Sequence, residues 1–301
     1  MDELDEEIVS LLEADGRLTH REIAQQVGLS RSAAATRMQR LIGTGQVVVR
    51  GVVHPAVLGR GALAHVSVTV AGPVAGLAAL LARRDDVAFL SLTSGSYGLV
   101  AEVRSGSMRE IDRAVAELRA LDGVVGVDTL SYVEVVRDVI GPVGDVSVEV
   151  DAVDLALLRA LQDDGRASYV DLAVAVGLSP AGARRRVVRL VEAQVVRIGA
   201  VVRHSGQDRQ NAMGLGIRLT GDFTAVVETL RAMPSVIFVA RTLGRFDLLV
   251  TVRAFSAAQL VEILDVVRGL RGVSGVESWV HLEVVKENYA SGLATNLPAA
   301  R

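Results

Sequence analysis

The chain has 301 residues, half of them hydrophobic, and a formal net charge of −3. It contains no cysteine, which excludes disulfides, thiolate metal sites and a cysteine nucleophile. The acidic start, Met1-Asp2-Glu3-Leu4-Asp5, predicts no signal peptide, and no apolar run is long enough for a membrane span, so we expect a cytoplasmic protein.

The second half of the sequence repeats the first at an offset of 149 residues. Asp15-Gly16-Arg17 returns as Asp164-Gly165-Arg166, and Val27-Gly28-Leu29-Ser30 returns as Val176-Gly177-Leu178-Ser179. Each copy has the length of one compact domain or of a pair of small ones, far more than a solenoid repeat. We therefore predict a duplicated protein whose two copies pair within one chain, as separate subunits would.

Three short helices open each copy. Apolar residues at helical spacing predict the first helix over 4–14, and Asp15-Gly16-Arg17 ends it, with Gly16 supplying a left-handed turn. The second helix, over 19–27, begins at a capping box formed by Thr19 and Glu22.

A third helix and a strand complete the first part of the copy. Ser30 caps the third helix, which runs to about Gly43, and a valine-rich strand follows over 47–53. In the second copy, Ser179 and Pro180 begin the third helix and the strand covers 195–202. Three helices followed by a strand predict a winged helix-turn-helix.

The second part of each copy alternates strands and helices. The order βαββαβ predicts a ferredoxin-like sandwich, so the fold class is α+β. In the first copy the expected elements are strand 64–70, helix 74–84, strands 87–93 and 99–103 around a hairpin, helix 108–120 and strand 124–136.

These elements predict four domains. They are winged helix-turn-helix domains at 1–53 and 153–202, and effector-type βαββαβ domains at 60–138 and 211–288, with a linker at 139–152 that contains Gly141 and Pro142.

The chain resembles the leucine-responsive regulator (Lrp/AsnC) family over nearly its whole length, twice. The residues that carry the resemblance are Leu4-Asp5, Asp15-Gly16-Arg17, Glu22-Ile23-Ala24, Val27-Gly28-Leu29-Ser30, Arg40-Leu41 and Gly123-Val124. It implies a DNA-binding transcriptional regulator that responds to a small molecule, plausibly an amino acid, has no cofactor and is not an enzyme. It also implies assembly into homo-oligomers.

The chain also resembles the siroheme decarboxylases, which are built from the same two-part unit. The stretch from Arg197 to His204 is similar to the segment that follows their wing strand. The Cys-Tyr-x-Arg and Trp-Pro-Tyr-Asn stretches usual in those enzymes are replaced by 239–242 and 244–247, and cysteine is absent. A tetrapyrrole enzyme is therefore the alternative function, and an effector-binding protein that no longer reads DNA is a third.

The third helix is predicted to meet double-stranded DNA. Ala34, Met38 and Leu41 form its packing face. The opposite face offers short polar and basic side chains suited to base edges and phosphates: Arg31, Ser32, Thr36, Arg37, Gln39 and Arg40. An ordinary solvated face would show the same pattern.

The corresponding helix of the second copy carries arginines and no short polar groups. Arg184, Arg185, Arg186 and Arg189 favour phosphate contact over base reading, unless this copy has kept only a packing role.

The hairpin turns are the predicted effector sites, because effectors of the resembled family bind near this loop. In the second copy, Thr242, Gly244, Arg245 and Asp247 offer a hydroxyl, close backbone approach, a guanidinium and a carboxylate. In the first copy, Thr93, Ser94, Gly95 and Tyr97 remain, but Gly98 replaces the carboxylate. A plain solvated hairpin is the alternative.

The histidines show no metal-ligand spacing, and no catalytic constellation is predicted. His204, beside Arg203, is of interest only because of the decarboxylase resemblance.

Overall fold

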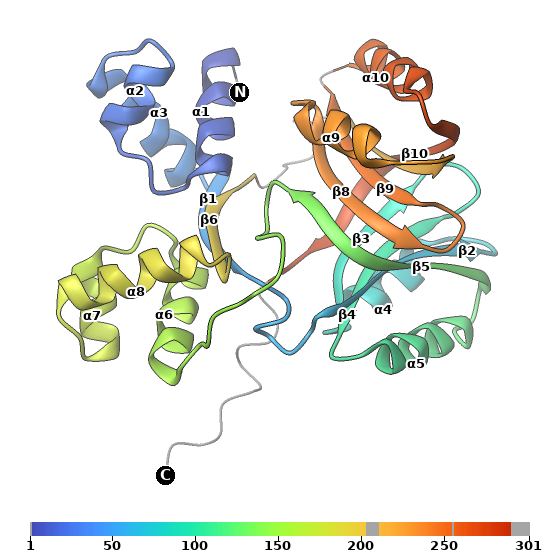
Figure 1. Cartoon of the computed structure of the whole chain (residues 1–301), viewed down its shortest axis with the longest axis horizontal. Helices are drawn as coiled ribbons and strands as arrows, with labels where there is room; N and C mark the ends of the chain where they lie inside the picture. The colour runs from blue at the N-terminus through green and yellow to red at the C-terminus, as the bar shows by residue number, and fades with distance from the viewer. Residues whose placement is uncertain (1, 203–210, 255, 290–301) are drawn as a thin grey trace. The chain divides into compact units, whose positions relative to one another are not determined.

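The structure, a computed structural model, describes residues 2–202, 211–254 and 256–289 (Figure 1). The chain divides into two compact units, and both copies contribute to each. The helix-turn-helix unit combines residues 1–57 with 139–209, and the barrel unit combines residues 58–138 with 210–301.

The helix-turn-helix unit contains six helices and two strands among its described residues. The predicted caps are confirmed: Thr19 and Ser30 accept hydrogen bonds from backbone N–H groups of α2 and α3, and Pro180 is the first residue of α8. The elements are α1 (Glu3–Ala14), α2 (His20–Gln26), α3 (Arg31–Gly43), β1 (Val47–Val53), α6 (Ala152–Asp163), α7 (Tyr169–Val176), α8 (Pro180–Glu192) and β6 (Val196–Val202).

The two wing strands pair with each other. β1 and β6 form a two-stranded antiparallel sheet, with Val47 opposite Val202 and Val53 opposite Val196. The first helix of each copy packs on the strand of the other, so α1 lies against β6 and α6 against β1. The pairing joins the two helix-turn-helix domains into one body.

The arginine of each Asp-Gly-Arg motif reaches into the other copy. Arg17 donates hydrogen bonds to the carbonyls of Gly165 and Ala167, at 2.8 and 2.9 Å. Arg166 donates in the same way to the carbonyls of Gly16 and Leu18. The two sets of hydrogen bonds are related by the 149-residue repeat, and they connect the Asp-Gly-Arg turns of the two copies.

The left-handed conformation predicted for Gly16 is wrong. Gly16 is not among the glycines with a positive φ, and the helix ends at Asp15 in extended backbone. Glycine is required there by close approach: a Cβ would lie 2.5 Å from Cγ1 of Val49 and 3.1 Å from Cα of Gly199. The sheet shared between the copies therefore needs a residue without a side chain at this turn.

The barrel unit confirms the two βαββαβ domains. Each forms a four-stranded antiparallel sheet whose outer face is covered by two helices (Figure 1). The elements are β2 (Ala62–Val70), α4 (Ala75–Ala82), β3 (Val87–Thr93), β4 (Leu99–Ser105), α5 (Met108–Arg119), β5 (Val124–Asp138), β7 (Asn211–Leu219), α9 (Thr224–Ala232), β8 (Val236–Leu243), β9 (Leu248–Ala254), α10 (Ala257–Gly269) and β10 (Val273–Glu287).

The two sheets close into one eight-stranded barrel. β5 pairs with β8 and β10 pairs with β3, both antiparallel, so each long final strand crosses to the other copy. The predicted packing of the two effector-type domains on each other is confirmed.

The ring of Trp279, in the second copy, occupies space in the barrel interior that a glycine on the neighbouring strand leaves open. Trp279 lies opposite Gly214, and a Cβ on Gly214 would be 2.2 Å from the indole ring. The first copy has His65 at the position of Gly214, and its ring centroid lies 5.6 Å from that of Trp279.

His65 gives the fold a predicted pH dependence. Its side chain is 6% exposed, and burial, reinforced by His281 and Arg245, lowers its pKa to about 3. In the unfolded chain this histidine takes up a proton near pH 6.5, whereas in the folded chain it stays neutral down to about pH 3. The contribution of His65 to the free energy of unfolding is therefore fully present above pH 6.5. It is lost as the pH falls toward 3, at about 1.4 kcal/mol per pH unit.

The glutamine variant of His65 isolates this contribution. Between pH 7 and pH 5, the stability of the parent relative to His65→Gln should fall by about 2 kcal/mol, measured by urea unfolding. A difference that does not change with pH would show that His65 takes up its proton as readily in the folded chain as in the unfolded chain.

Candidate DNA-binding faces and effector hairpins

Helix α3 presents the predicted polar face. Ala34, Met38 and Leu41 are buried, as expected, whereas Ser32, Thr36 and Gln39 are exposed. The Ser30 side chain that caps the helix lies 3.1 Å from the Ser32 hydroxyl, and the Thr36 hydroxyl donates to the Ser32 carbonyl at 3.0 Å.

Two side chains of this face are uncommitted. Arg31 and Gln39 are exposed and have no hydrogen bond or ion pair with any part of the chain that the structure describes. Gln39 therefore offers a bidentate amide, and Arg31 a guanidinium, to an external partner.

Arg37 and Arg40 face the chain itself. Asp5 is 1% exposed and accepts from Arg37 at 2.7 Å and from Arg40 at 2.5 Å. Arg37 also reaches Asp2, the residue that caps α1 in a capping box with Asp5. Burial raises the pKa of Asp5, but the two guanidinium groups outweigh it and leave the pKa below its usual value.

The second copy repeats this cluster. Arg186 bonds to Asp151 at 2.6 Å and to Asp154 at 2.9 Å, and Arg189 forms an ion pair with Asp154. Our sequence reasoning missed these acids. The sequence contained a signal for this cluster, because the Asp and Arg positions of the first copy recur together in the second copy at the 149-residue offset.

Replacing Arg37 with alanine should destabilise the fold. The buried Asp5 carboxylate loses one of its two guanidinium partners, which we expect to cost about 1–3 kcal/mol in the free energy of unfolding, measured by urea denaturation. Arg31→Ala is the matched control and should change stability by less than about 0.5 kcal/mol, because Arg31 has no internal partner. Equal stabilities of the two variants would contradict the structural role.

The four arginines of helix α8 fall into two pairs. Arg186 and Arg189 belong to the aspartate cluster, whereas Arg184 and Arg185 are exposed. Neither Arg184 nor Arg185 has a partner among the described residues. Among the described residues, these two are therefore the arginines of α8 whose charges are not paired within the chain.

Both hairpins use the predicted threonine to close the turn. The Thr242 hydroxyl donates to the Phe246 carbonyl at 2.7 Å, and the Thr93 hydroxyl donates to the Tyr97 carbonyl at 2.9 Å. Both threonines are 7% exposed. Their hydroxyl protons are therefore committed within the hairpins.

Each hairpin lies on the long strand of the other copy. The Ser94 backbone N–H donates to the Val280 carbonyl, and the Ser94 hydroxyl accepts from the Val280 N–H at 3.0 Å. Gly244 approaches β5 closely, because a Cβ there would lie 2.6 Å from Cδ2 of Leu130. Gly95 has a positive φ of 96°, which suits a glycine turn.

Asp247 and Gly98 occupy equivalent positions of the two hairpins but differ in their surroundings. The Asp247 carboxylate is exposed and accepts a hydrogen bond from the Leu219 N–H at 2.7 Å. At Gly98, a Cβ would lie 2.9 Å from Cγ1 of Val74, so the first hairpin has no room for the aspartate.

Arg245 joins the two copies. It forms ion pairs with Asp128 of β5 at 3.0 Å and with Glu277 of β10 at 2.9 Å, and these two acids are equivalent in the repeat. Its guanidinium also lies over the rings of Tyr97 and Phe246. The carboxylate partners of Arg245 thus come from the protein.

The described residues contain neither a cluster of metal ligands nor a helix that could span a membrane. Within residues 2–202, 211–254 and 256–289, no three acidic or histidine side chains gather as metal ligands would, and no helix combines the length and apolarity of a membrane span. Arg203 and His204 lie outside the described residues.

Known domain profiles match both parts of the chain. The AsnC-type helix-turn-helix domain matches residues 1–42 and again 150–191, and the Lrp/AsnC ligand binding domain matches residues 215–291.

The sequence relatives are transcriptional regulators. The HTH-type transcriptional regulator FL11 of Pyrococcus furiosus is 28% identical over 140 residues, covering 46% of this chain and 93% of the relative. The Bkd operon transcriptional regulator of Pseudomonas aeruginosa is 34% identical over 145 residues, covering 46% of this chain and 94% of the relative. One relative thus spans about one copy.

A solved structure matches nearly the whole chain. The siroheme decarboxylase NirDL, in co-complex with an iron-uroporphyrin III analogue, covers 96% of this chain and 94% of its own, with a TM-score of 0.63 and 14% identity. The likeness shows a common fold.

Proposed function

The chain belongs to the Lrp/AsnC family, and from this premise we propose that it is a cytoplasmic transcriptional regulator that binds double-stranded DNA through α3 and α8. The observation that carries the proposal is the exposed, uncommitted set on the two helices: Arg31 and Gln39 on one, Arg184 and Arg185 on the other. Gln39 suits a base edge, and the arginines suit phosphates or guanine.

The two recognition faces differ, so we propose an asymmetric DNA site. α3 supplies the sequence-reading half, because it holds short polar side chains beside Arg31. α8 supplies a tolerant half, because its free groups are two arginines.

The direct test is a genome-wide DNA pull-down with the purified full chain, followed by gel shift of the enriched fragments. We expect an enriched motif with one conserved half and one variable half, about 10 bp or a multiple apart. Recovery of DNA without any enriched motif would contradict sequence-specific regulation.

We also propose that a small molecule, of amino-acid type, binds at the second hairpin and changes the affinity for DNA. Asp247 is the exposed carboxylate of that hairpin, has no cationic partner among the described residues and suits an ammonium group, whereas the first hairpin has Gly98. The Thr242 hydroxyl is engaged internally, and Arg245 is held by ion pairs through Nε and Nη1, whereas its buried Nη2 has no hydrogen-bond partner among the described residues.

Asp247→Asn tests the effector site. The amide retains an acceptor for the Leu219 N–H but removes the charge, so affinity for an amino-acid ligand should fall about tenfold, measured by calorimetric titration with the common amino acids. Asp112→Ala, which removes an exposed carboxylate on α5, should bind as the parent does. Unchanged binding by Asp247→Asn would exclude the role, and no binding by the parent would exclude an amino-acid effector.

A further inference from the structure

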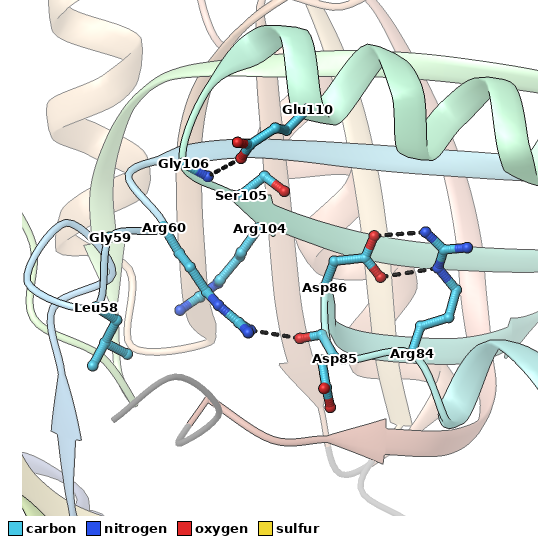
Figure 2. A pocket seen from close by; sticks show the side chains of 10 residues that line it. All are labelled: Leu58, Gly59, Arg60, Arg84, Asp85, Asp86, Arg104, Ser105, Gly106 and Glu110. Carbon is cyan, nitrogen blue, oxygen red and sulfur yellow. Dashed lines mark hydrogen bonds and ion pairs between the residues drawn. The ribbon is translucent and has the colours of Figure 1, made fainter. Parts of the chain in front are cut away.

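A polar pocket lies in the first copy of the barrel unit, away from the hairpins. It is formed where β4 ends (Figure 2), and the 94–98 turn lies at the opposite end of that strand, before Leu99. Its volume of about 550 Å³ falls within the roughly 300–1,000 Å³ typical of small-molecule sites. The charged side chains in its lining are Arg60, Arg84, Asp85, Asp86, Arg104 and Glu110.

Arg104 is the buried cation of the pocket. It is 8% exposed, its Nε donates to Glu102 at 2.5 Å, and the ring of Tyr289 lies 4.7 Å from its guanidinium carbon. Burial disfavours its charge, but the Glu102 carboxylate outweighs that effect and keeps the pKa above its ordinary value. Its two terminal nitrogens have no hydrogen-bond partner among the described residues and remain available to an occupant of the pocket.

Arg60 reaches into the same pocket from the segment before β2 (Figure 2). One of its terminal nitrogens donates to the Asp85 carbonyl at 2.5 Å, and this is its one hydrogen bond within the described part of the chain. The backbone contact orients the guanidinium without neutralising it.

The acidic side chains of the lining are already engaged or point elsewhere. Asp86 receives two hydrogen bonds from Arg84, at 2.9 and 2.7 Å. Glu110 accepts from the Gly106 N–H at 2.8 Å. The Asp85 carboxylate is directed away from Arg60 in Figure 2. The cationic donors of the lining that have no carboxylate partner among the described residues are the terminal nitrogens of Arg60 and Arg104.

We propose that this pocket binds a small organic molecule through an oxyanion, either a carboxylate or a phosphate, with Arg60 and Arg104 as its charged partners. Arg60 and Arg104 line the same pocket, and their terminal guanidinium nitrogens have no carboxylate partner among the described residues, which suits a planar or tetrahedral oxyanion. The volume leaves room for an organic body beyond the oxyanion. This is a second ligand site, separate from the hairpin at which we place the effector.

The charged wall of the pocket is specific to the first copy. The repeat places Met233, Ser235 and Gln259 at the positions of Arg84, Asp86 and Glu110, while Arg253 stands at the position of Arg104. The residue equivalent to Arg60 lies outside the described residues. The ion pair between Arg84 and Asp86 in the pocket lining therefore has no equivalent at the corresponding positions of the second copy.

The test is calorimetric titration of the full chain at low ionic strength with two probes, inorganic phosphate and succinate. We expect at least one of them to bind saturably. Arg60→Ala should weaken that binding at least about tenfold, because a charge-assisted contact is lost. Arg83→Ala is the matched control: it removes an exposed arginine outside the lining and should leave binding within about twofold of the parent.

Two results would overturn the proposal. One is the absence of binding of both probes to the parent. The other is parental affinity in Arg60→Ala, whose fold should survive because Arg60 contacts one backbone carbonyl. A preference for phosphate or for succinate assigns the oxyanion. Asp247→Asn should bind the probes as the parent does, which separates this site from the hairpin effector site.

Discussion

Replacing both Arg184 and Arg185 with alanine is expected to weaken binding to every DNA sequence, whether or not it contains the preferred site. Both side chains are exposed on α8 and have no partner among the described residues, so their charges are available to phosphates. Each charge-assisted contact is worth about 1.5 kcal/mol or more, so the pair should account for about a hundredfold in affinity.

The salt dependence identifies the contact as phosphate. Each neutralised phosphate contributes a slope of about −0.9 to a plot of log affinity against log salt, so the double variant should lose about 2 from the magnitude of the slope. The measurement is a gel-shift titration at several salt concentrations. A double alanine variant at Arg113 and Arg119, two exposed arginines of α5, removes the same charge from the barrel unit and should retain the parental slope.

An unchanged slope in Arg184→Ala/Arg185→Ala would assign α8 a packing role and leave DNA contact to α3. Arg186 and Arg189 are unsuited to the same experiment. Replacing them would also leave the buried Asp154 carboxylate without its ion-pair partners, so DNA binding and the stability of the fold would change together.

Adding one methyl group at Gly214 or Gly216 should destabilise the barrel strongly. A Cβ at either residue would lie 2.2 Å from the nearest ring carbon, of Trp279 and Phe246 respectively. Both rings are buried, at 7% and 1% exposure, and belong to one apolar cluster with Val100, Leu130 and Leu249. Overpacking of this kind costs about 1–3 kcal/mol, and we expect the upper end because a ring has to move.

Urea unfolding of Gly214→Ala and Gly216→Ala measures this cost. Gly76→Ala is the control, because nothing lies within 4 Å of the added methyl group and the site is exposed in α4. Alanine should be neutral there or stabilise by up to about 1 kcal/mol. Parental stability in the Gly214 and Gly216 variants would mean that the rings do not occupy these hollows.

Local patterns in the sequence predicted the elements well. The caps at Thr19, Ser30 and Ser179 begin helices because a side-chain oxygen satisfies N–H groups a few residues away. The strand 47–53 matches β1, and the βαββαβ order holds in both copies. Each of these depends on neighbours within one element or one turn, so the amino-acid sequence alone carries the information.

The candidate sites were predicted only in part. The exposure of Ser32, Thr36 and Gln39 followed from the buried face of the same helix, because helical periodicity places both. Periodicity does not distinguish a free arginine from a paired one. Arg185 and Arg189 have the same pattern in the sequence, yet Arg189 is bound to an aspartate 35 residues away.

The sequence by itself determined the duplicated plan, the kinds of domain and the buried and exposed faces of the third helix, because these rest on the repeat, on the order of elements and on spacing within one helix. Only the tertiary structure decided that β1 pairs with β6, that Gly16 is needed for close approach, and that Arg60 and Arg104 share a pocket. The reason is physical: an open strand edge or a free guanidinium accepts any suitable partner, and the partner is selected by packing between residues distant in the chain.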